Sequence, residues 1–208
     1  MKNIAVLVSG GGTNLQALID AQNRGEIING KITCVISSNP TAYALERAKN
    51  NNIDTHIIKR KDYELFEDYD VALTERLLRN NIDVVVLAGF MTILGSKVIK
   101  TFENRIINIH PSLIPSFCGE GYYGLRVHQE ALKKGVKVTG ATAHFVNEVC
   151  DGGPIIIQKA VEVMQGDTPE ALQKRVMEQA EWKILPLAVS LFCQGKIVVE
   201  DNITTILE

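Results

Sequence analysis

Short apolar runs rich in β-branched residues recur along the first half of the chain. They show little alternation with polar residues, which is typical of strands buried on both faces of a parallel sheet. Strand-sized length separates them from buried helices. The predicted strands cover residues 4–8, 32–36, 84–88 and 106–109, with a shorter one over 55–58.

Stretches with helical periodicity lie between these strands. Each carries apolar residues on one face and polar residues on the others. Repeated strand–helix–strand units predict a doubly wound sheet. The apolar positions that mark the three helices are Leu15, Leu18 and Ile19, then Ala44, Leu45 and Ala48, then Val71, Leu77 and Leu78.

The second half departs from simple alternation. A long strand is predicted over residues 138–146, and a second, of antiparallel character, over 155–163. A sheet that contains both kinds of pairing is mixed. We therefore predict a single-domain α/β protein over 1–208, with a Rossmann-like doubly wound sheet that is parallel in its N-terminal half and mixed toward the C-terminus.

A long C-terminal helix is predicted to begin near residue 168. Thr168 can cap it, Pro169 suits its first turn, and Glu170 complements the helix dipole. Pro186 should kink or restart the helix. A glycine at 195 should end it before a strand over residues 196–200.

The overall charge is nearly balanced, with 22 basic and 24 acidic residues. No global field favours nucleic acid or an anionic membrane, so we expect neither as a partner. We find no apolar stretch of roughly 18 residues that could span a bilayer, and the apolar region at the start is too short for a secretory signal. These features predict a cytoplasmic protein.

The four cysteines lie far apart in sequence and form no Cys-x-x-Cys pair. This spacing argues against a zinc site or a redox couple, and we expect no metal. Cys34 and Cys193 should act as small core residues. Trp182 and Phe192 are likewise expected to pack rather than to recognise a ligand.

A glycine-rich turn, Ser-Gly-Gly-Gly-Thr-Asn, follows the first strand at residues 9–14. A turn that opens a helix offers free backbone N–H groups to an anion, and Thr13 or Asn14 can cap the helix or bind ligand oxygen. The turn has no Gly-Lys-Ser/Thr, and Leu15 replaces the last glycine of a dinucleotide fingerprint. We favour phosphate as the ligand over a tight turn without one.

Asn108 lies near the end of the strand over residues 106–109, and His110 directly follows that strand. Two residues apart on an extended backbone, they point to the same side, and Pro111 keeps His110 extended. An imidazole that relays a proton beside a carboxamide that stabilises an oxyanion suits acyl transfer. The alternative is structural, with Asn108 fixing a loop and His110 partly buried.

Asp151 precedes Gly-Gly-Pro in a turn. If the carboxylate lies close to His110, it should favour the imidazolium and raise the pKa of His110. The alternative is a turn former without a chemical role.

Four stretches together resemble the phosphoribosylglycinamide formyltransferase family of purine biosynthesis, over nearly the whole chain. They are residues 9–15, 87–91, 108–115 (Asn-Ile-His-Pro-Ser-Leu-Ile-Pro) and 151–154. The resemblance implies that His110 is the general acid-base, that Asn108 steadies the formyl oxygen, and that Asp151 tunes His110. It also implies 10-formyltetrahydrofolate as co-substrate, the amine of N1-(5-phospho-D-ribosyl)glycinamide as acceptor, and a monomer or homodimer.

The same resemblance implies two binding regions. The phosphate of glycinamide ribotide would lie on Gly12, Thr13 and Asn14, and its amine on Glu181 with Glu178 nearby. This divides the chain into a phosphate-binding half, 1–105, and a catalytic and folate-binding half, 106–208. The folate pterin would lie along Met91, Thr92, Ile93 and Leu94 and against Asn147, Glu148, Val149, Cys150 and Asp151.

The chain departs from the family pattern in several places. Thr92 stands where arginine is common, which removes one expected contact to folate. A basic residue usual at the start of the third helix has three candidates here, Lys59, Arg60 and Lys61. The glycine-rich loop over residues 117–124 is either a lid or a solvated surface loop.

The remaining histidines carry less information. His144 lies inside the long strand, where the family commonly has histidine, and either contacts substrate or is structural. His56 and His128 carry no motif and are expected at the surface or at loop edges.

Three other functions compete with this interpretation. A formylfolate hydrolase would use water in place of the amine, but such enzymes usually carry an extra N-terminal domain. A methionyl-tRNA formyltransferase normally adds a C-terminal nucleic-acid-binding domain. A non-catalytic folate or ribosyl-phosphate sensor would not need Asn108, His110 and Asp151 together.

Overall fold

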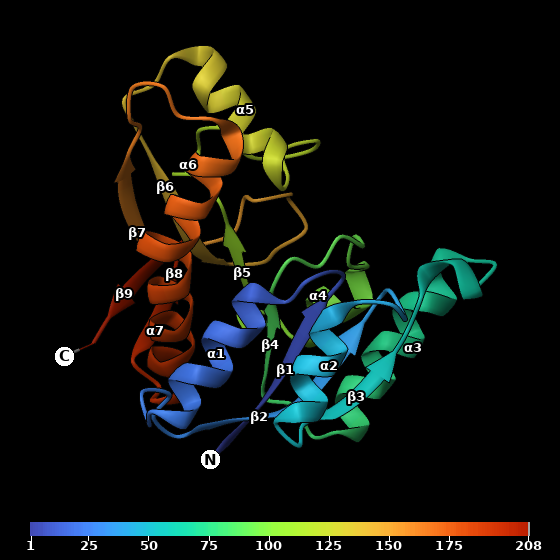
Figure 1. Ribbon diagram of the computed structural model, residues 1–208. Helices are drawn as coiled ribbons and strands as arrows, with labels where there is room; N and C mark the ends of the chain where they lie inside the picture. The colour runs from blue at the N-terminus through green and yellow to red at the C-terminus, as the bar shows by residue number, and fades with distance from the viewer. Residues whose placement is uncertain (208) are drawn as a thin grey trace.

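One seven-stranded sheet forms the centre of the molecule in the computed structural model, which describes residues 1–207. The strands lie in the order β3-β2-β1-β4-β5-β6-β7 (Figure 1). This confirms the α/β fold with a mostly parallel sheet. The strands are β1 (Lys2–Val8), β2 (Gly30–Ser37), β3 (Asp54–Ile57), β4 (Val84–Leu87), β5 (Ile106–His110), β6 (Val138–Phe145) and β7 (Ile155–Glu162).

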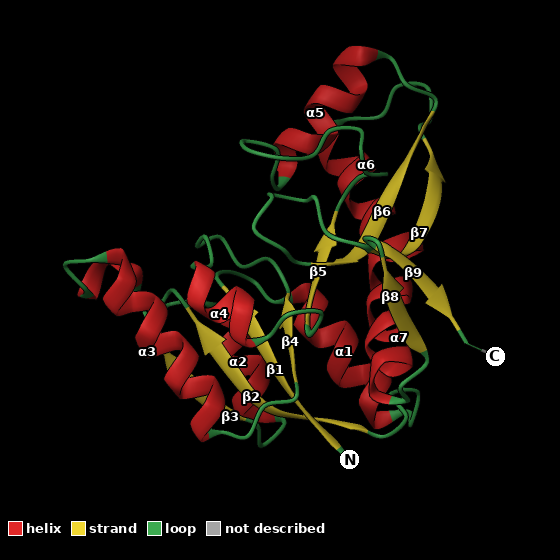
Figure 2. Cartoon of the chain, turned by 180° about the vertical axis from the view of Figure 1, so that it is seen from behind, coloured by secondary structure: helices red, strands yellow, loops and turns green. Residues whose placement is uncertain are grey.

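Helices cover both faces of the sheet (Figure 2). One core lies beneath α1, α2, α6 and α7, and a second lies beneath α3 and α4. A short 3-10 segment, Arg60–Asp62, precedes α3. The helices are α1 (Thr13–Asn23), α2 (Tyr43–Asn50), α3 (Phe66–Arg79), α4 (Ser96–Thr101), α5 (Leu125–Lys134), α6 (Pro169–Val176) and α7 (Trp182–Cys193).

The pairing changes direction beside β5. β4 and β5 are parallel, whereas β5 and β6, and β6 and β7, are antiparallel, so the sheet is mixed as predicted. The last residue of β4, Leu87, lies level with Asn108. β5 therefore extends beyond β4 and carries His110 past the carboxyl edge of its parallel neighbour.

Several elements differ from the sequence prediction. In α3 the buried face is formed by Tyr69, Leu73 and Leu77, whereas Leu78 is 52% exposed. The prediction that Leu78 belongs to the apolar face of this helix is therefore wrong. Helices α4 and α5 were not predicted, and neither was the last strand.

The C-terminal helix begins as predicted, because Thr168 accepts a hydrogen bond from the N–H of Ala171. Pro186 does not end the helix, which continues to Cys193. Instead, a π-helical segment, Met177–Glu181, separates α6 from α7. Pro186 has no N–H and cannot donate to the carbonyl of Trp182, the first residue of α7. The irregularity therefore lies one turn before the proline.

The chain ends in a hairpin of β8 (Ile197–Glu200) and β9 (Ile203–Ile206), separate from the main sheet. Asp201 and Asn202 form its turn with φ of 48° and 62°. Two successive left-handed residues fit the type I′ turn that tight hairpins prefer.

Within residues 1–207, no helix combines the length and apolar character that crossing a membrane requires. Cys34 and Cys193 are buried, as expected of small core residues.

Candidate active site

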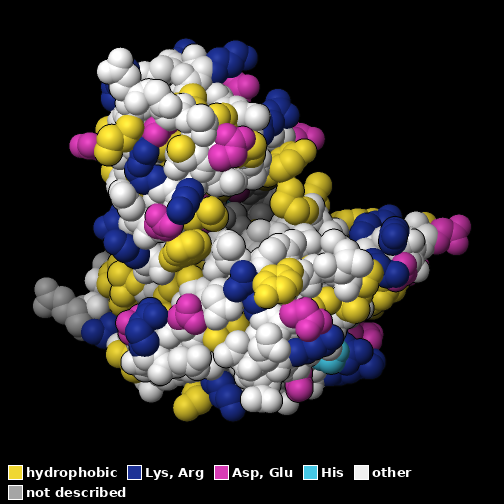
Figure 3. Space-filling model, viewed as in Figure 1, with side chains coloured by type: hydrophobic (Ala, Val, Ile, Leu, Met, Phe, Trp, Pro, Cys, Tyr) yellow, Lys and Arg dark blue, Asp and Glu magenta, His cyan; other side chains and the backbone are white. Residues whose placement is uncertain are grey.

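Asn108 and His110 lie on β5. The surface is hollowed between the part of the molecule that carries α5 and α6 and the part that carries α1 to α3 (Figure 3). Asn108 is half-buried and His110 is 4% exposed. The imidazole has partners on both sides. Its Nε2 donates to the carbonyl of Phe117 at 2.8 Å, and its Nδ1 lies 3.5 Å from Oδ2 of Asp151.

The predicted closeness of Asp151 to His110 is therefore present in the structure. The Asp151 carboxylate also accepts the N–H of Gly119 at 2.8 Å and lies 3.6 Å from Nε2 of His144. Asp151 itself has a φ of 53°, in the left-handed region. The turn thus places the carboxylate between two histidines and the glycine-rich loop.

His144 orients Asn108. It is 1% exposed, its Nδ1 donates to the carbonyl of Phe145 at 2.7 Å, and its Nε2 accepts from Nδ2 of Asn108 at 3.1 Å. This pattern assigns the proton to Nδ1. The carboxamide of Asn108 keeps its second N–H for another acceptor, so the contacts favour the structural role for His144.

Burial decides the pKa of His110. Desolvation lowers it below its usual value, and the charge of Asp151 and the Phe117 carbonyl only partly oppose this effect. The charge of Asp151 raises the pKa of His110 as expected, but burial disfavours the imidazolium more strongly, so the pKa still lies below its usual value. For Asp151, burial raises the pKa, but contacts with His144 and His110 and the N–H of Gly119 outweigh it and hold the pKa below its usual range.

The loop over residues 117–124 contacts the site directly. Phe117, with a φ of 50°, presents its carbonyl to His110, and Gly119 donates to Asp151. Phe117 and Tyr122 pack ring against ring at 6.4 Å between centroids. In this conformation the loop covers the Nε2 atom of His110.

The glycine turn opens α1 as predicted, but neither Thr13 nor Asn14 caps the helix. The cap position is Gly12, in the left-handed conformation and without a side-chain hydrogen bond, so first-turn N–H groups stay available. A Cβ on Gly12 would lie 2.6 Å from Cβ of Ala44, whereas Gly11 has open space around it. Gly12 is therefore required by packing against α2.

Asn14 and Glu181 meet across the molecule. Nδ2 of Asn14 donates to Oε2 of Glu181 at 2.7 Å, and Glu181 is 6% exposed. Burial raises the pKa of Glu181 to about 7 despite this hydrogen bond. Glu178 does not join them: it is exposed and lies 3.9 Å from Lys174 on its own helical stretch.

The predicted folate-binding residues form two loops near β5. The N–H of Met91 donates to Oγ of Ser9 at 2.9 Å, which ties the loop after β4 to the glycine turn. Met91 and Ile93 are exposed, Thr92 is partly exposed, and Leu94 packs into the core.

The second loop runs from the end of β6 to Asp151. Oδ1 of Asn147 accepts the N–H of Val149 at 3.0 Å, and Glu148 lies 3.4 Å from Lys100 on α4. Although the Cys150 side chain is largely exposed, partial desolvation of the thiol and the charge of Asp151 raise its pKa. The residues of this loop that were predicted to bind folate thus form the segment that leads into Asp151.

Of the three basic candidates before α3, two have internal partners. Lys59 lies 2.8 Å from Asp62, and Arg60 donates to the carbonyl of Tyr63 and lies over the ring of Phe66. Lys61 is exposed.

Arg47 is a charged neighbour of the glycine turn that the sequence did not reveal. Its Nε donates to the carbonyl of Gly11 at 2.9 Å, and its guanidinium lies over the ring of Tyr43. Arg47 reaches the glycine turn only because α2 packs against Gly12, and the sequence does not reveal that packing.

His128 corrects another prediction. It is completely buried on α5, not at the surface, and neither ring nitrogen has a hydrogen-bond partner among the described residues. Burial lowers the pKa of His128 to about 4. The helix that carries it was not predicted, so its inward face could not be assigned. His56, by contrast, is partly exposed on β3.

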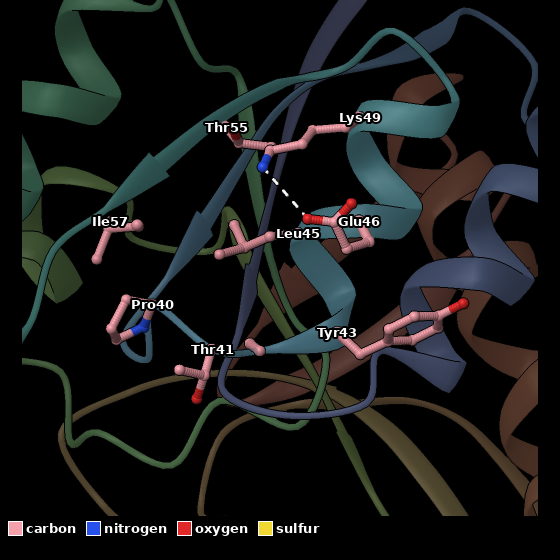
Figure 4. A pocket seen from close by; sticks show the side chains of 9 residues that line it. Pro40, Thr41, Tyr43, Leu45, Glu46, Lys49, Thr55 and Ile57 are labelled. Atoms are coloured by element: carbon pink, nitrogen blue, oxygen red, sulfur yellow. Dashed lines mark hydrogen bonds and ion pairs between the residues drawn. The ribbon is translucent and has the colours of Figure 1, made fainter.

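A separate pocket opens at the start of α2 (Figure 4). It is lined in part by Pro40, Tyr43 and Ile57, and Lys49 pairs with Glu46 there at 3.3 Å. The predicted site residues lie elsewhere. Among residues 1–207, no group of three or more His, Cys, Asp or Glu side chains is arranged to hold a metal ion.

Comparison with known proteins identifies relatives of the whole chain. The profile of the formyl transferase family matches residues 2–189. Phosphoribosylglycinamide formyltransferase of Haemophilus influenzae is 42% identical over 203 residues, which cover 98% of this chain and 92% of that protein.

Solved structures show the same fold. Glycinamide ribonucleotide transformylase 1 of Symbiobacterium toebii superposes with a TM-score of 0.94 at 43% identity, covering 100% of this chain and 95% of the other. A formyltetrahydrofolate deformylase of Pseudomonas syringae gives a TM-score of 0.88 at 28% identity, and the match covers 100% of this chain but 66% of that one. The chain therefore belongs to the formyl transferase family.

Proposed function

We propose that this protein transfers a formyl group from 10-formyltetrahydrofolate to the amine of N1-(5-phospho-D-ribosyl)glycinamide in purine biosynthesis. The observation that carries the proposal is the contact between the buried His110 and Asp151, 3.5 Å apart, beside Asn108. The length over which the chain matches phosphoribosylglycinamide formyltransferases supports the choice of substrate.

The reaction needs no covalent enzyme intermediate. The neutral amine attacks the formyl carbon, and the negative charge that develops on the formyl oxygen is stabilised by Nδ2 of Asn108 and Nε2 of His110. The amine proton then passes to the folate nitrogen as its bond to the formyl carbon breaks. His110 relays this proton, and Asp151 stabilises the imidazolium through Nδ1.

The glycine-rich loop must move for this to happen. Nε2 of His110 now donates to the carbonyl of Phe117, so the formyl oxygen has to replace that carbonyl. The loop therefore acts as a lid that exchanges an internal acceptor for the substrate.

The binding residues follow from the same arrangement. Backbone N–H groups at Gly12, Thr13 and Asn14 bind the phosphate, and the buried carboxyl of Glu181 receives the acceptor amine. Because Asn14 and Glu181 are hydrogen-bonded, the phosphate-binding half, 1–105, and the catalytic and folate-binding half, 106–208, build the substrate site together.

The folate pterin lies between the two loops beside β5. One is formed by Met91, Thr92, Ile93 and Leu94, and the other by the residues from Asn147 to Asp151. The exposed side chains of Met91 and Ile93 and the tie between Met91 and Ser9 support this assignment.

A formyl-transfer assay with three acceptors tests the proposal. Glycinamide ribotide, water and aminoacylated tRNA are offered separately with 10-formyltetrahydrofolate, and the formylated product is identified by mass spectrometry. We expect turnover with glycinamide ribotide, and a loss of about 10²- to 10⁴-fold in kcat for His110→Ala. Formate as the main product would support the hydrolase instead, and near-normal turnover of His110→Ala would remove its role.

A further inference from the structure

The loop that carries Asp151 is held through its main chain as well as through its carboxylate. Asp151 adopts a φ of 53°, in the left-handed region that residues with a Cβ seldom adopt. Such a conformation persists when its surroundings hold it in place. The next residue, Gly152, has a carbonyl that accepts from two side-chain amides, Nδ2 of Asn147 at 3.2 Å and Nδ2 of Asn202 at 3.3 Å.

Asn202 reaches Gly152 from a distant part of the chain. It lies in the turn of the β8–β9 hairpin, 50 residues away in sequence. Thr204 on β9 makes a second contact, donating through Oγ1 to the carbonyl of Ile155, where β7 begins. The hairpin thus contacts the main chain on the C-terminal side of Asp151 at two points, and it lies beyond the residues 2–189 that match the family profile.

The proposed function gives this tether a chemical consequence. Nδ1 of His110 lies 3.5 Å from Oδ2 of Asp151. The attraction between a carboxylate and an imidazolium weakens as the distance between them grows. A shift of the Gly152 carbonyl would move the adjacent Asp151 and weaken its hold on His110. Small misplacements of catalytic groups have large effects on rate.

We propose that Asn202 is a positioning residue for the formyl-transfer reaction: its side-chain amide holds the carbonyl of Gly152 and so fixes Asp151 against His110. This inference rests on the proposed function for its effect on catalysis. The structural part, a tether between the hairpin and the loop, can be measured without turnover.

The turn offers a matched pair of variants. Both Asp201 and Asn202 have positive φ, so glycine fits either position, and Asp201 makes no side-chain hydrogen bond within the described residues. Asn202→Gly removes the amide and Asp201→Gly does not. We expect similar Tm values, a loss of about three- to tenfold in kcat for Asn202→Gly alone, and little change in KM.

The pH profile separates positioning from simple stabilisation. With Asp151 less firmly held, His110 loses part of the interaction that favours its imidazolium, so the alkaline limb of kcat should move to lower pH in Asn202→Gly but not in Asp201→Gly. Asn202→Asp, which keeps the shape but replaces the donor with an acceptor, should behave like Asn202→Gly. Equal kcat and equal pH profiles in the two glycine variants would overturn the proposal.

Hydrogen exchange supplies a readout that needs no substrate. Peptides covering residues 147–153 should exchange faster in Asn202→Gly than in Asp201→Gly and in the unaltered protein. If the unaltered protein does not formylate glycinamide ribotide, the proposed function fails, and this exchange difference still decides whether the tether exists. Equal exchange in all three proteins would contradict it.

Discussion

Nδ2 of Asn14 donates a hydrogen bond of 2.7 Å to Oε2 of Glu181, joining residues 167 positions apart. Asn14 lies in the first turn of α1 and Glu181 at the end of the π-helical segment. The carboxyl group is buried, and its other surroundings do not compensate for lost water, so the pKa rises to about 7. A carboxyl with such a pKa changes charge near neutrality.

We expect Glu181→Gln to remove a pH dependence of stability. The folded-state pKa of about 7 lies above the usual value of 4.5 for this carboxyl group. The protonated carboxyl therefore stabilises the fold fully below pH 4.5, and this contribution is lost as pH rises through 7. Relative to the unaltered protein, the glutamine variant should gain up to roughly 3 kcal/mol between pH 4.5 and 8.

Denaturant unfolding across this pH range measures the effect, and Glu178→Gln is the control, because Glu178 is exposed. An identical pH dependence in Glu181→Gln and the unaltered protein would show that Glu181 ionises normally. If Glu181 also receives the acceptor amine, the variant should raise KM for glycinamide ribotide by about tenfold or more.

Asp151→Asn should lower the pKa of His110 further. In the folded protein the carboxylate is the main influence that opposes burial. Without it, less imidazolium is present at neutral pH, so kcat should fall by about 10²-fold and its alkaline limb should move to lower pH. An NMR titration of the His110 ring checks the direction, and an upward shift of its pKa would contradict the assignment.

His128→Leu should reduce sensitivity to acid. Burial depresses the pKa of His128 from 6.5 to about 4, so the fold loses stability as pH falls from 6.5 through 4, by up to roughly 3 kcal/mol. Since no hydrogen bond to the ring is present among the described residues, leucine removes this cost without removing a hydrogen bond. Tm measured from pH 7.5 to 4 should fall less in the variant.

His56→Gln is the comparison for that experiment. Burial also lowers the pKa of His56, but this residue is only partly buried, so the variant should reduce acid sensitivity less than His128→Leu does. If His128→Leu loses stability with acid to the same extent as the unaltered protein, another group is responsible.

Gly12→Ala and Gly11→Ala should differ in stability although they are neighbours. A Cβ at position 12 would lie 2.6 Å from Cβ of Ala44, and the alanine would have to adopt a φ of 73°. A Cβ at position 11 would have no atom within 4 Å. We expect Gly12→Ala to cost about 2–4 kcal/mol and Gly11→Ala less than about 1 kcal/mol. Chemical denaturation of both variants decides, and equal costs would show that α2 moves aside.

The parallel part of the sheet could be predicted because each strand carries its own signal. Residues 4–8 and 32–36 are apolar enough to be recognised without their neighbours. β9 was missed because Ile203 and Ile206 are exposed and its place depends on contacts such as that of Thr204 with Ile155. Helix α4 was missed because its first N–H groups bond to Asp70, a side chain of α3.

The membership of the site could be predicted, but its electrostatics could not. Asn108, His110 and Asp151 stand in recognisable motifs, and the structure brings them together. The sign of the shift in the pKa of His110 depends on burial, which no motif encodes. The link of Asn108 to His144 likewise depends on how β5 and β6 align.

The π-helical segment Met177–Glu181 sets the direction in which the side chains of α7 leave the helix relative to those of α6. Its wider turn holds an additional residue compared with an α-helical turn, and the buried residues of α6 and α7 pack in the same core on either side of it. Removing a single amino acid between 177 and 180 would restore an ordinary α-helical turn. It would also rotate the side chains of α7 by about a quarter turn relative to those of α6. Chain length within this short stretch is therefore under tighter constraint than the identity of its exposed residues.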